Sequence, residues 1–188
     1  MRRRNETRAD ARRRAAAGRA SPSMRSTAAA RRLHTDPART VTVLNTTRKK
    51  LPLRRWEKFA AGVLDAAGAG GELSLSFVGR RLITRLNRRY LQRRGDTDVI
   101  SFPMDAPGET ARGTPRVLGD VVICLERAAK DAAKEGMPLP RKLEALIVHG
   151  VLHVMGFDHG TPRDEMEMKS EERRIWKTLV KKTKAPGR

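Results

Sequence analysis

The sequence of 188 residues contains a single cysteine, Cys124, so an internal disulfide cannot form. A chain without disulfides fits a reducing compartment, and we expect a cytoplasmic location. Long apolar runs are also missing, and none approaches the roughly 18 residues that a membrane-spanning helix needs. These absences exclude disulfide-stapled secreted proteins and membrane-embedded proteins, and we expect no membrane partner.

Acidic residues are scarce beside basic ones. The chain has 21 Asp and Glu against 41 Lys and Arg, which gives a formal net charge of +20. Each basic side chain that neutralises a phosphate releases condensed counterions. The charge excess therefore favours a polyanionic partner, above all nucleic acid.

Residues 1–40 differ in composition from the rest of the chain. They contain 12 Arg, no Lys and three acidic residues, and their larger apolar side chains are limited to Met1, Met24 and Leu33. Because such a segment buries too little apolar surface to offset its chain entropy, we predict a disordered N-terminal extension. It has no apolar stretch of the secretory type. Three interpretations stay open: an RNA-binding arm, an acid-poor targeting peptide, or an upstream extension with Met24 as another start.

Residues 41–188 are predicted to form one catalytic domain of the α+β class, since strands come early and helices late. Alternation of apolar and polar residues predicts strands, and apolar residues at helical spacing predict helices. The predicted strands are 41–46, 73–77, 98–102 and 117–124. The predicted helices are 53–68, 80–92, 125–135, 139–155 and 161–182, with a loop at 104–115. On the basic helix 80–92 the side chains expected to point inward are Leu82, Ile83, Leu86 and Tyr90.

Three of the four histidines lie within eleven positions, in the segment HGVLHVMGFDH at 149–159. His149 and His153 are four residues apart, so their imidazoles project from the same face of a helix. Gly156 lets the chain leave the helix and return His159 toward the same point. Three imidazoles that leave a fourth position for water form the ligand set of a catalytic zinc site. We therefore predict one Zn²⁺ per chain, held by His149, His153 and His159, although three histidines also accept nickel, cobalt or iron.

The surroundings of these histidines sharpen the prediction. Residues 145–157 contain no charge and are apolar all round, which is typical of a buried helix. Zinc peptidases with the motif H-E-x-x-H carry a general-base Glu directly after the first histidine, where this chain has Gly150. A peptidase is therefore disfavoured.

Cys124 is either a fourth ligand, which would make the site structural, or a core residue at a strand end, and the core position is favoured.

The segment HGVLHVMGFDH closely resembles the signature of the YbeY family, bacterial metal-dependent endoribonucleases needed for ribosomal RNA maturation. The segments LNRRY, TDVISFP and GDVVIC and the start of the last helix also resemble family segments, in family order, over roughly residues 41–182. The resemblance implies a zincin-like α+β fold. In that fold a small mixed sheet packs with helices around a buried central helix that carries the metal ligands.

The same resemblance implies cleavage of single-stranded RNA, in maturation of small-subunit (16S) ribosomal RNA and in ribosome quality control. The implied partners are single-stranded RNA, ribosomal RNA and the small ribosomal subunit, and no oligomeric state is indicated. An alternative is an RNA- and zinc-binding ribosome assembly factor with little catalytic activity. Many family members carry an Arg lining the cleft where this chain has Leu91, and Arg93 and Arg94 are the candidates to replace it.

Several residues are candidates for the chemistry around such a metal. A three-histidine zinc delivers hydroxide or acts as a Lewis acid on a phosphoryl oxygen, and the nucleophile is either water or the RNA 2′-hydroxyl. Asp158 either hydrogen-bonds the metal-bound water, orients a histidine or belongs to the turn. Asp98 and Ser101 either approach the cleft or cap the end of a strand.

The densest basic cluster lies on the predicted helix 80–92 and just after it. No acidic residue occurs between Glu72 and Asp96, and Tyr90 lies within the cluster as a candidate stacking platform. The predicted RNA-binding residues are Arg85, Arg88, Arg89 and Tyr90. The competing interpretation is a solvated helix face.

Overall fold

The computed structural model describes residues 39–105 and 116–184, with no side-chain detail for 181–184. The extension predicted at 1–40 lies outside the described residues, apart from its last two. Most of the loop predicted at 104–115 lies outside them too. Among the described residues, no helix combines the length and the apolar character needed to span a lipid bilayer.

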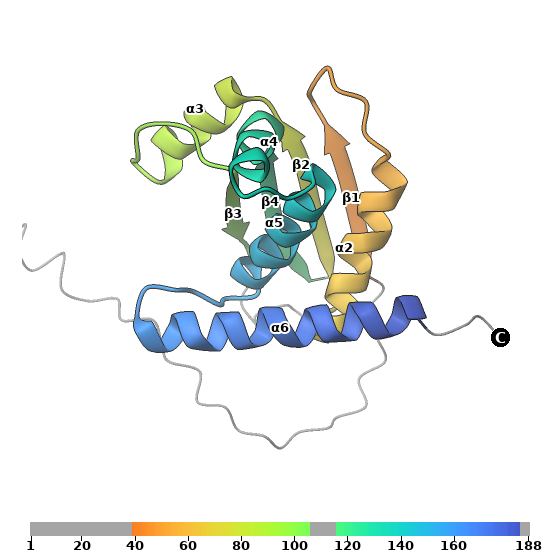
Figure 1. Ribbon diagram of the computed structural model, residues 1–188. Helices are drawn as coiled ribbons and strands as arrows, with labels where there is room; N and C mark the ends of the chain where they lie inside the picture. The colour runs from red at the N-terminus through yellow and green to blue at the C-terminus, as the bar shows by residue number, and fades with distance from the viewer. Residues whose placement is uncertain (1–38, 106–115, 185–188) are drawn as a thin grey trace, which may run out of the picture. The chain divides into compact units, whose positions relative to one another are not determined.

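A four-stranded mixed sheet forms the centre of the fold (Figure 1). Its strands are β1 (Thr40–Asn45), β2 (Glu72–Val78), β3 (Val99–Pro103) and β4 (Val117–Cys124), in the spatial order β1-β2-β4-β3. The pairs β1–β2 and β2–β4 are parallel, and β3 pairs antiparallel with β4. The predicted α+β class with a small mixed sheet is confirmed.

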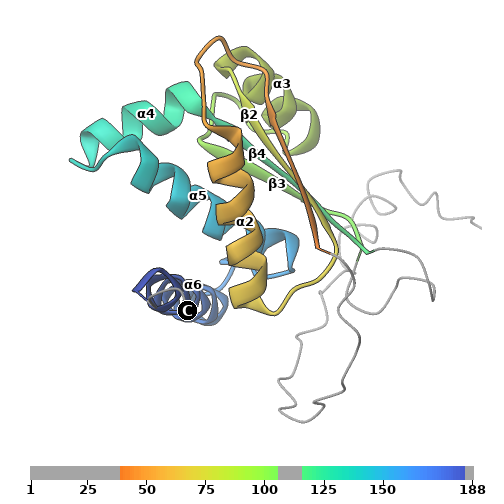
Figure 2. The same ribbon diagram turned by 90° about the vertical axis from the view of Figure 1, so that its right-hand side faces the viewer.

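The described residues form five helices, which are α2 (Leu53–Ala67), α3 (Arg80–Tyr90), α4 (Leu125–Lys134), α5 (Leu139–Val154) and α6 (Pro162–Lys184). Helices α2 and α5 lie on one face of the sheet, and α3 lies on the other (Figure 2). The long helix α6 runs across α2 and the end of α5 (Figure 1). All predicted strands and helices are present, with ends that differ from the predicted ones by a few residues.

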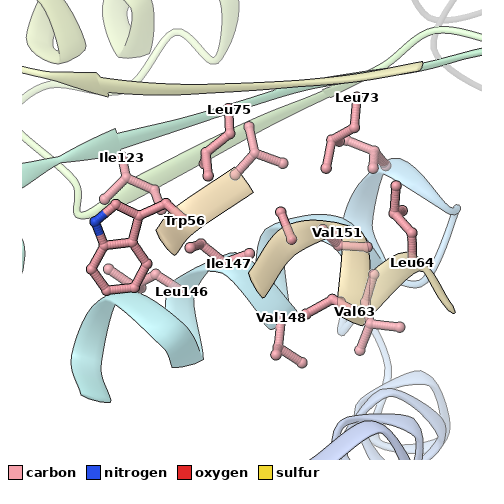
Figure 3. Packing of buried hydrophobic residues seen from close by; sticks show 14 of the residues in the cluster. Trp56, Val63, Leu64, Leu73, Leu75, Ile123, Leu146, Ile147, Val148 and Val151 are labelled. Atoms are coloured by element: carbon pink, nitrogen blue, oxygen red, sulfur yellow. The ribbon is translucent and has the colours of Figure 1, made fainter. Parts of the chain in front are cut away.

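The part of α5 from Leu146 onward is buried because its apolar side chains point in nearly every direction. Leu146, Ile147, Val148 and Val151 pack against side chains of α2 and of the strands (Figure 3). Burial of each such side chain contributes about 1.5–3 kcal/mol. The central helix thus has the buried position that its sequence predicts, and its histidines have a rigid support.

One prediction about α3 is wrong. Leu82, Ile83 and Leu86 do pack against the sheet, but Tyr90 is 57% exposed. Tyr90 is the last residue of α3 and lies beyond the packed part of the helix. Its ring meets the edge strand β3 through Phe102, with ring centroids 5.2 Å apart.

The closest approach of α5 to the sheet is at Gly150. A Cβ atom at this position would lie 2.6 Å from Cγ1 of Val121 on β4 and 3.2 Å from Oγ of Ser101 on β3. Val121 is fully buried, so it has no free space to move into. The hydroxyl of Ser101 also donates a hydrogen bond to the carbonyl oxygen of Gly150 at 3.1 Å. Position 150 therefore has no room for the Glu of an H-E-x-x-H peptidase.

Replacing Gly150 by Ala is expected to lower the free energy of unfolding by about 1–3 kcal/mol, because the new methyl group overpacks the contact with Val121. Gly62→Ala in α2 is the matched control, since a Cβ there meets only the end of the Leu179 side chain, at 3.3 Å. Urea denaturation measures both variants. A Gly150→Ala protein as stable as the Gly62→Ala protein would contradict the close packing.

Candidate metal centre

The three signature histidines converge at one end of α5. His149 and His153 lie on α5, and His159 lies in the loop between α5 and α6. One ring nitrogen from each of the three lies within 4.8 Å of the others. The predicted meeting of the three imidazoles is thus present in the structure.

The turn after α5 brings His159 back to the helix. Gly156 has φ +94°, a left-handed conformation that glycine adopts without strain. The backbone N–H groups of Gly156 and Phe157 donate to the carbonyl oxygens of His153 and Leu152, so the last carbonyls of the helix are satisfied. Oδ1 of Asp158 accepts a hydrogen bond from the backbone N–H of His159 at 2.8 Å. Of the three roles considered for Asp158, this contact supports the role in the turn.

The spacing of the imidazole nitrogens fits a metal ion. Nε2 of His149 and Nε2 of His153 face each other at 3.1 Å. Two nitrogen ligands on a tetrahedral zinc, each at about 2.0–2.1 Å, would lie about 3.3 Å apart. Among the described residues, the cluster contains no cysteine and no carboxylate. Three protein ligands would leave a fourth coordination position for water or substrate.

Glu172 is a residue of this site that the sequence analysis missed. Its Oε1 lies 3.1 Å from Nδ1 of His149, across 23 residues of sequence. A proton on Nδ1 that is donated to this carboxylate leaves the lone pair of Nε2 directed at the other histidines. Met168 and Ile175 are the buried positions of α6, and Glu172 lies on the same stripe. A charged residue on the buried stripe is the signal that could have identified it.

Burial, reinforced by the neighbouring His149 and His159, holds the pKa of His153 below its usual value of 6.5. His153 therefore stays neutral at neutral pH. The neutral imidazole is the form that binds a metal ion.

Three other candidate residues, Cys124, Asp98 and Ser101, do not belong to the three-histidine cluster. Cys124 is fully buried in the core between α3 and the sheet, and burial raises the pKa of its thiol. The favoured core position of Cys124 is therefore confirmed. Asp98 accepts a hydrogen bond from the backbone N–H of Val99, so it caps a strand end, whereas Ser101 contacts the histidine-bearing helix.

The predicted arginines are exposed. Arg85, Arg88 and Arg89 lie on α3, and Arg93 and Arg94 lie in the segment that follows it. Within the part of the chain that the structure describes, no side-chain hydrogen bond or ion pair links Arg93 or Arg94 to the histidines. Their role in place of the family Arg at position 91 stays a prediction.

Fold and site define an α+β protein with a three-histidine site suited to a metal ion. Residues 42–180 match the family model described as endoribonuclease YbeY. The chain belongs to the endoribonuclease YbeY family.

Curated relatives agree with this assignment. The chain is 40% identical over 128 residues to Endoribonuclease YbeY of Mycobacterium ulcerans, over 65% of this chain and 71% of the relative. It is 38% identical over 117 residues to Endoribonuclease YbeY of Halorhodospira halophila, over 62% and 76% of the two chains. A solution structure from Thermotoga maritima is similar to 79% of this chain and 99% of its own, with 17% identity and a TM-score of 0.49.

Replacing Glu172 by Gln is expected to weaken zinc or cobalt binding about 10- to 100-fold, because the carboxylate that orients His149 is lost. Competition titration against a chromophoric chelator measures the affinity. The matched control is Glu171→Gln, since Glu171 pairs with Arg174 and not with a histidine. Equal affinities of the two variants would remove Glu172 from the site.

The lowered pKa of His153 makes the stability of the metal-free protein depend on pH. Between that lowered pKa and the usual value of 6.5, the unfolded chain binds more protons than the folded one. The contribution of His153 to stability is therefore present above the usual value and is lost as the pH falls below it. Urea denaturation of chelator-treated protein from about pH 7 to about pH 5 measures this loss. The His153→Asn variant should show a shallower dependence, and an unchanged slope would contradict the pKa shift.

Proposed function

We propose that the protein is a metal-dependent endoribonuclease of the cytoplasm that cleaves single-stranded RNA. Its expected role is in the maturation of small-subunit (16S) ribosomal RNA and in ribosome quality control, on ribosomal RNA and the small ribosomal subunit. The expected cofactor is one Zn²⁺ per chain. The observation that carries the proposal is the convergence of His149, His153 and His159 on one point, in a chain whose curated relatives are named endoribonucleases.

A bound zinc ion would supply a Lewis acid and a position at which water loses a proton near neutral pH. Side chains of this protein would bind and orient the ion. His149, His153 and His159 would hold the ion, and the carboxylate of Glu172, 3.1 Å from Nδ1 of His149, would accept the hydrogen bond of the tautomer whose Nε2 is free to bind the metal. Burial keeps His153 neutral and therefore able to bind.

The rival functions are less well supported. A peptidase of the H-E-x-x-H type needs a Glu where Gly150 packs against Val121, and a side chain does not fit there. An assembly factor with little catalytic activity has no need for a site with an open fourth position, and the relatives' names do not favour it.

Replacing His153 by Ala is expected to abolish both the bound metal and the cleavage of single-stranded RNA, because one of three ligands is lost. Elemental analysis should find about one zinc per wild-type chain. His34→Ala is the matched control, since it removes the one histidine outside the signature and should leave metal and cleavage unchanged.

Two outcomes would contradict the proposal. Metal binding without cleavage of any single-stranded RNA would favour the assembly factor. Cleavage that survives in a folded, metal-free His153→Ala protein would remove the histidine site from the reaction.

A further inference from the structure

Helix α3 carries five arginines, and among the described residues only one of them, Arg80, pairs with a carboxylate. On α2, α4, α5 and α6, at least one arginine of each helix pairs with a carboxylate: Arg55–Glu144, Arg127–Asp131, Arg141–Glu144 and Arg163–Glu167. On α3, Arg80 pairs with Asp96. No carboxylate among the described residues pairs with Arg81, Arg85, Arg88 or Arg89. The outer face of α3 therefore carries uncompensated positive charge.

This charge is unfavourable for the helix itself. Arg81 and Arg85, and Arg85 and Arg89, are like charges four residues apart and repel each other. Arg81 also lies in the first turn, where the helix dipole disfavours a cation. Nothing in the packing of α3 requires these charges, since its buried residues are Ile83 and Asn87. A polyanion bound to this face would remove the repulsion.

The positions of these arginines suit an extended strand of phosphates. Arg81, Arg85 and Arg89 recur every four residues, so neighbours lie about 6 Å apart along the helix axis. The row winds slowly around α3 toward the side on which Tyr90 lies. Arg81 and Arg85, with Arg80 and Thr84, also line a shallow depression of about 780 Å³. The depression shares Arg81 and Arg85 with the row, so both lie on one basic face of α3.

At the end of this row lies an aromatic pair, Tyr90 of α3 and the half-buried Phe102 of β3. Tyr90 is 57% exposed, and its ring meets that of Phe102 edge-on at 5.2 Å. The guanidinium of Arg89 lies 5.7 Å from the Tyr90 ring centre. Unstacked bases of single-stranded RNA bind to such aromatic and guanidinium groups.

The aromatic pair and the histidine-bearing helix α5 contact neighbouring residues of the edge strand β3. Phe102 packs on the α3 face of the sheet. Its neighbour Ser101 points to the other face and donates its hydrogen bond to Gly150, the residue next to His149. A single strand of RNA that crosses the edge of the sheet at β3 would therefore pass from the face that carries α3 to the face that carries α5 and its histidines.

We propose that single-stranded RNA reaches the three histidines over strand β3, with its phosphates on Arg81, Arg85 and Arg89 and one base on Tyr90 and Phe102. The choice of RNA as the polymer rests on the proposed function. The unpaired arginine row and the aromatic pair support a single strand, because a duplex keeps its bases stacked and out of reach of an aromatic ring.

The arginine row is tested by binding of a fluorescein-labelled single-stranded RNA of about ten nucleotides to the full chain, with chelator present to prevent cleavage. The variant is Arg81→Gln, Arg85→Gln, Arg89→Gln. The matched control is Arg54→Gln, Lys58→Gln, Lys130→Gln, which removes the same charge from exposed positions on α2 and α4. Since each phosphate contact contributes about 0.7 to the slope of log affinity against log salt, the variant should lower that slope by about 2. An equal effect of the control would show a net-charge effect only and would overturn the assignment.

The aromatic pair is tested at Tyr90. Tyr90→Ala should weaken binding at least about fivefold, whereas Tyr90→Phe, which keeps the ring, should bind like the wild type. Equal losses in the two variants would contradict stacking. Equal or tighter binding of a duplex of the same sequence, with the same dependence on Tyr90, would also overturn the proposal.

The two proposals fail in different ways. Binding that depends on α3 and Tyr90 in a protein that cleaves no RNA would refute the nuclease and leave the binding surface standing. Cleavage that depends on His153, in a protein whose α3 variant binds RNA like the control, would refute the binding surface and leave the nuclease standing.

Discussion

The contact of α5 with the sheet at Gly150 is the constraint on which the rest of the site depends. The helix lies so close to β3 and β4 that no side chain fits at this position. The hydrogen bond from Ser101 fixes the same point from the strand. With the helix held there, its neighbouring positions 149 and 153 have set directions, and the two imidazoles face each other. Glycine at position 150 thus excludes the general-base Glu of an H-E-x-x-H peptidase. The close packing that it permits positions the metal ligands His149 and His153.

The metal centre couples elements that are far apart in sequence. Two ligands come from α5 and one from the loop that follows, and Glu172 of α6 holds the first ligand through its outer nitrogen. Helix α6 also packs across α2 through Ile175 and its neighbours. Correct docking of α6 is therefore needed to orient His149. A metal ion bound at such a site would in turn stabilise the docked arrangement, because the ligands converge only in the folded chain.

The arginines near α3 fall into two groups, those that pair with a carboxylate and those on the outer face of the helix that have no such partner among the described residues. Arg80 of α3 and Arg127 of α4 both pair with Asp96, in the segment between α3 and β3, and so link the two helices. The carboxylate of Glu126, on α4, accepts a hydrogen bond from the backbone N–H of Arg80 and so satisfies the start of α3. The fold uses its nearby acids to anchor α3 at one end, and the outer face of the helix keeps its charge.

The sequence by itself determined the elements and the three ligands. Strand alternation, helical spacing and the glycine turn act over a few residues, and all three histidines lie within one eleven-residue segment. Burial of the second half of α5 also followed from its composition, since residues 145–157 carry no charge and are apolar all round. The burial of Cys124 at a strand end was likewise predictable.

Only the tertiary structure decided the strand order, the partner of His149 and the exposure of Tyr90. Helical spacing places Glu172 on the buried stripe of α6, but it does not reveal that this stripe meets His149, 23 positions away. Tyr90 has the helical phase of a buried residue, yet it is the last residue of α3, and its ring meets the edge strand β3 and stays exposed. These features depend on which surfaces pack together, and packing is set by long-range contacts that a local pattern does not contain.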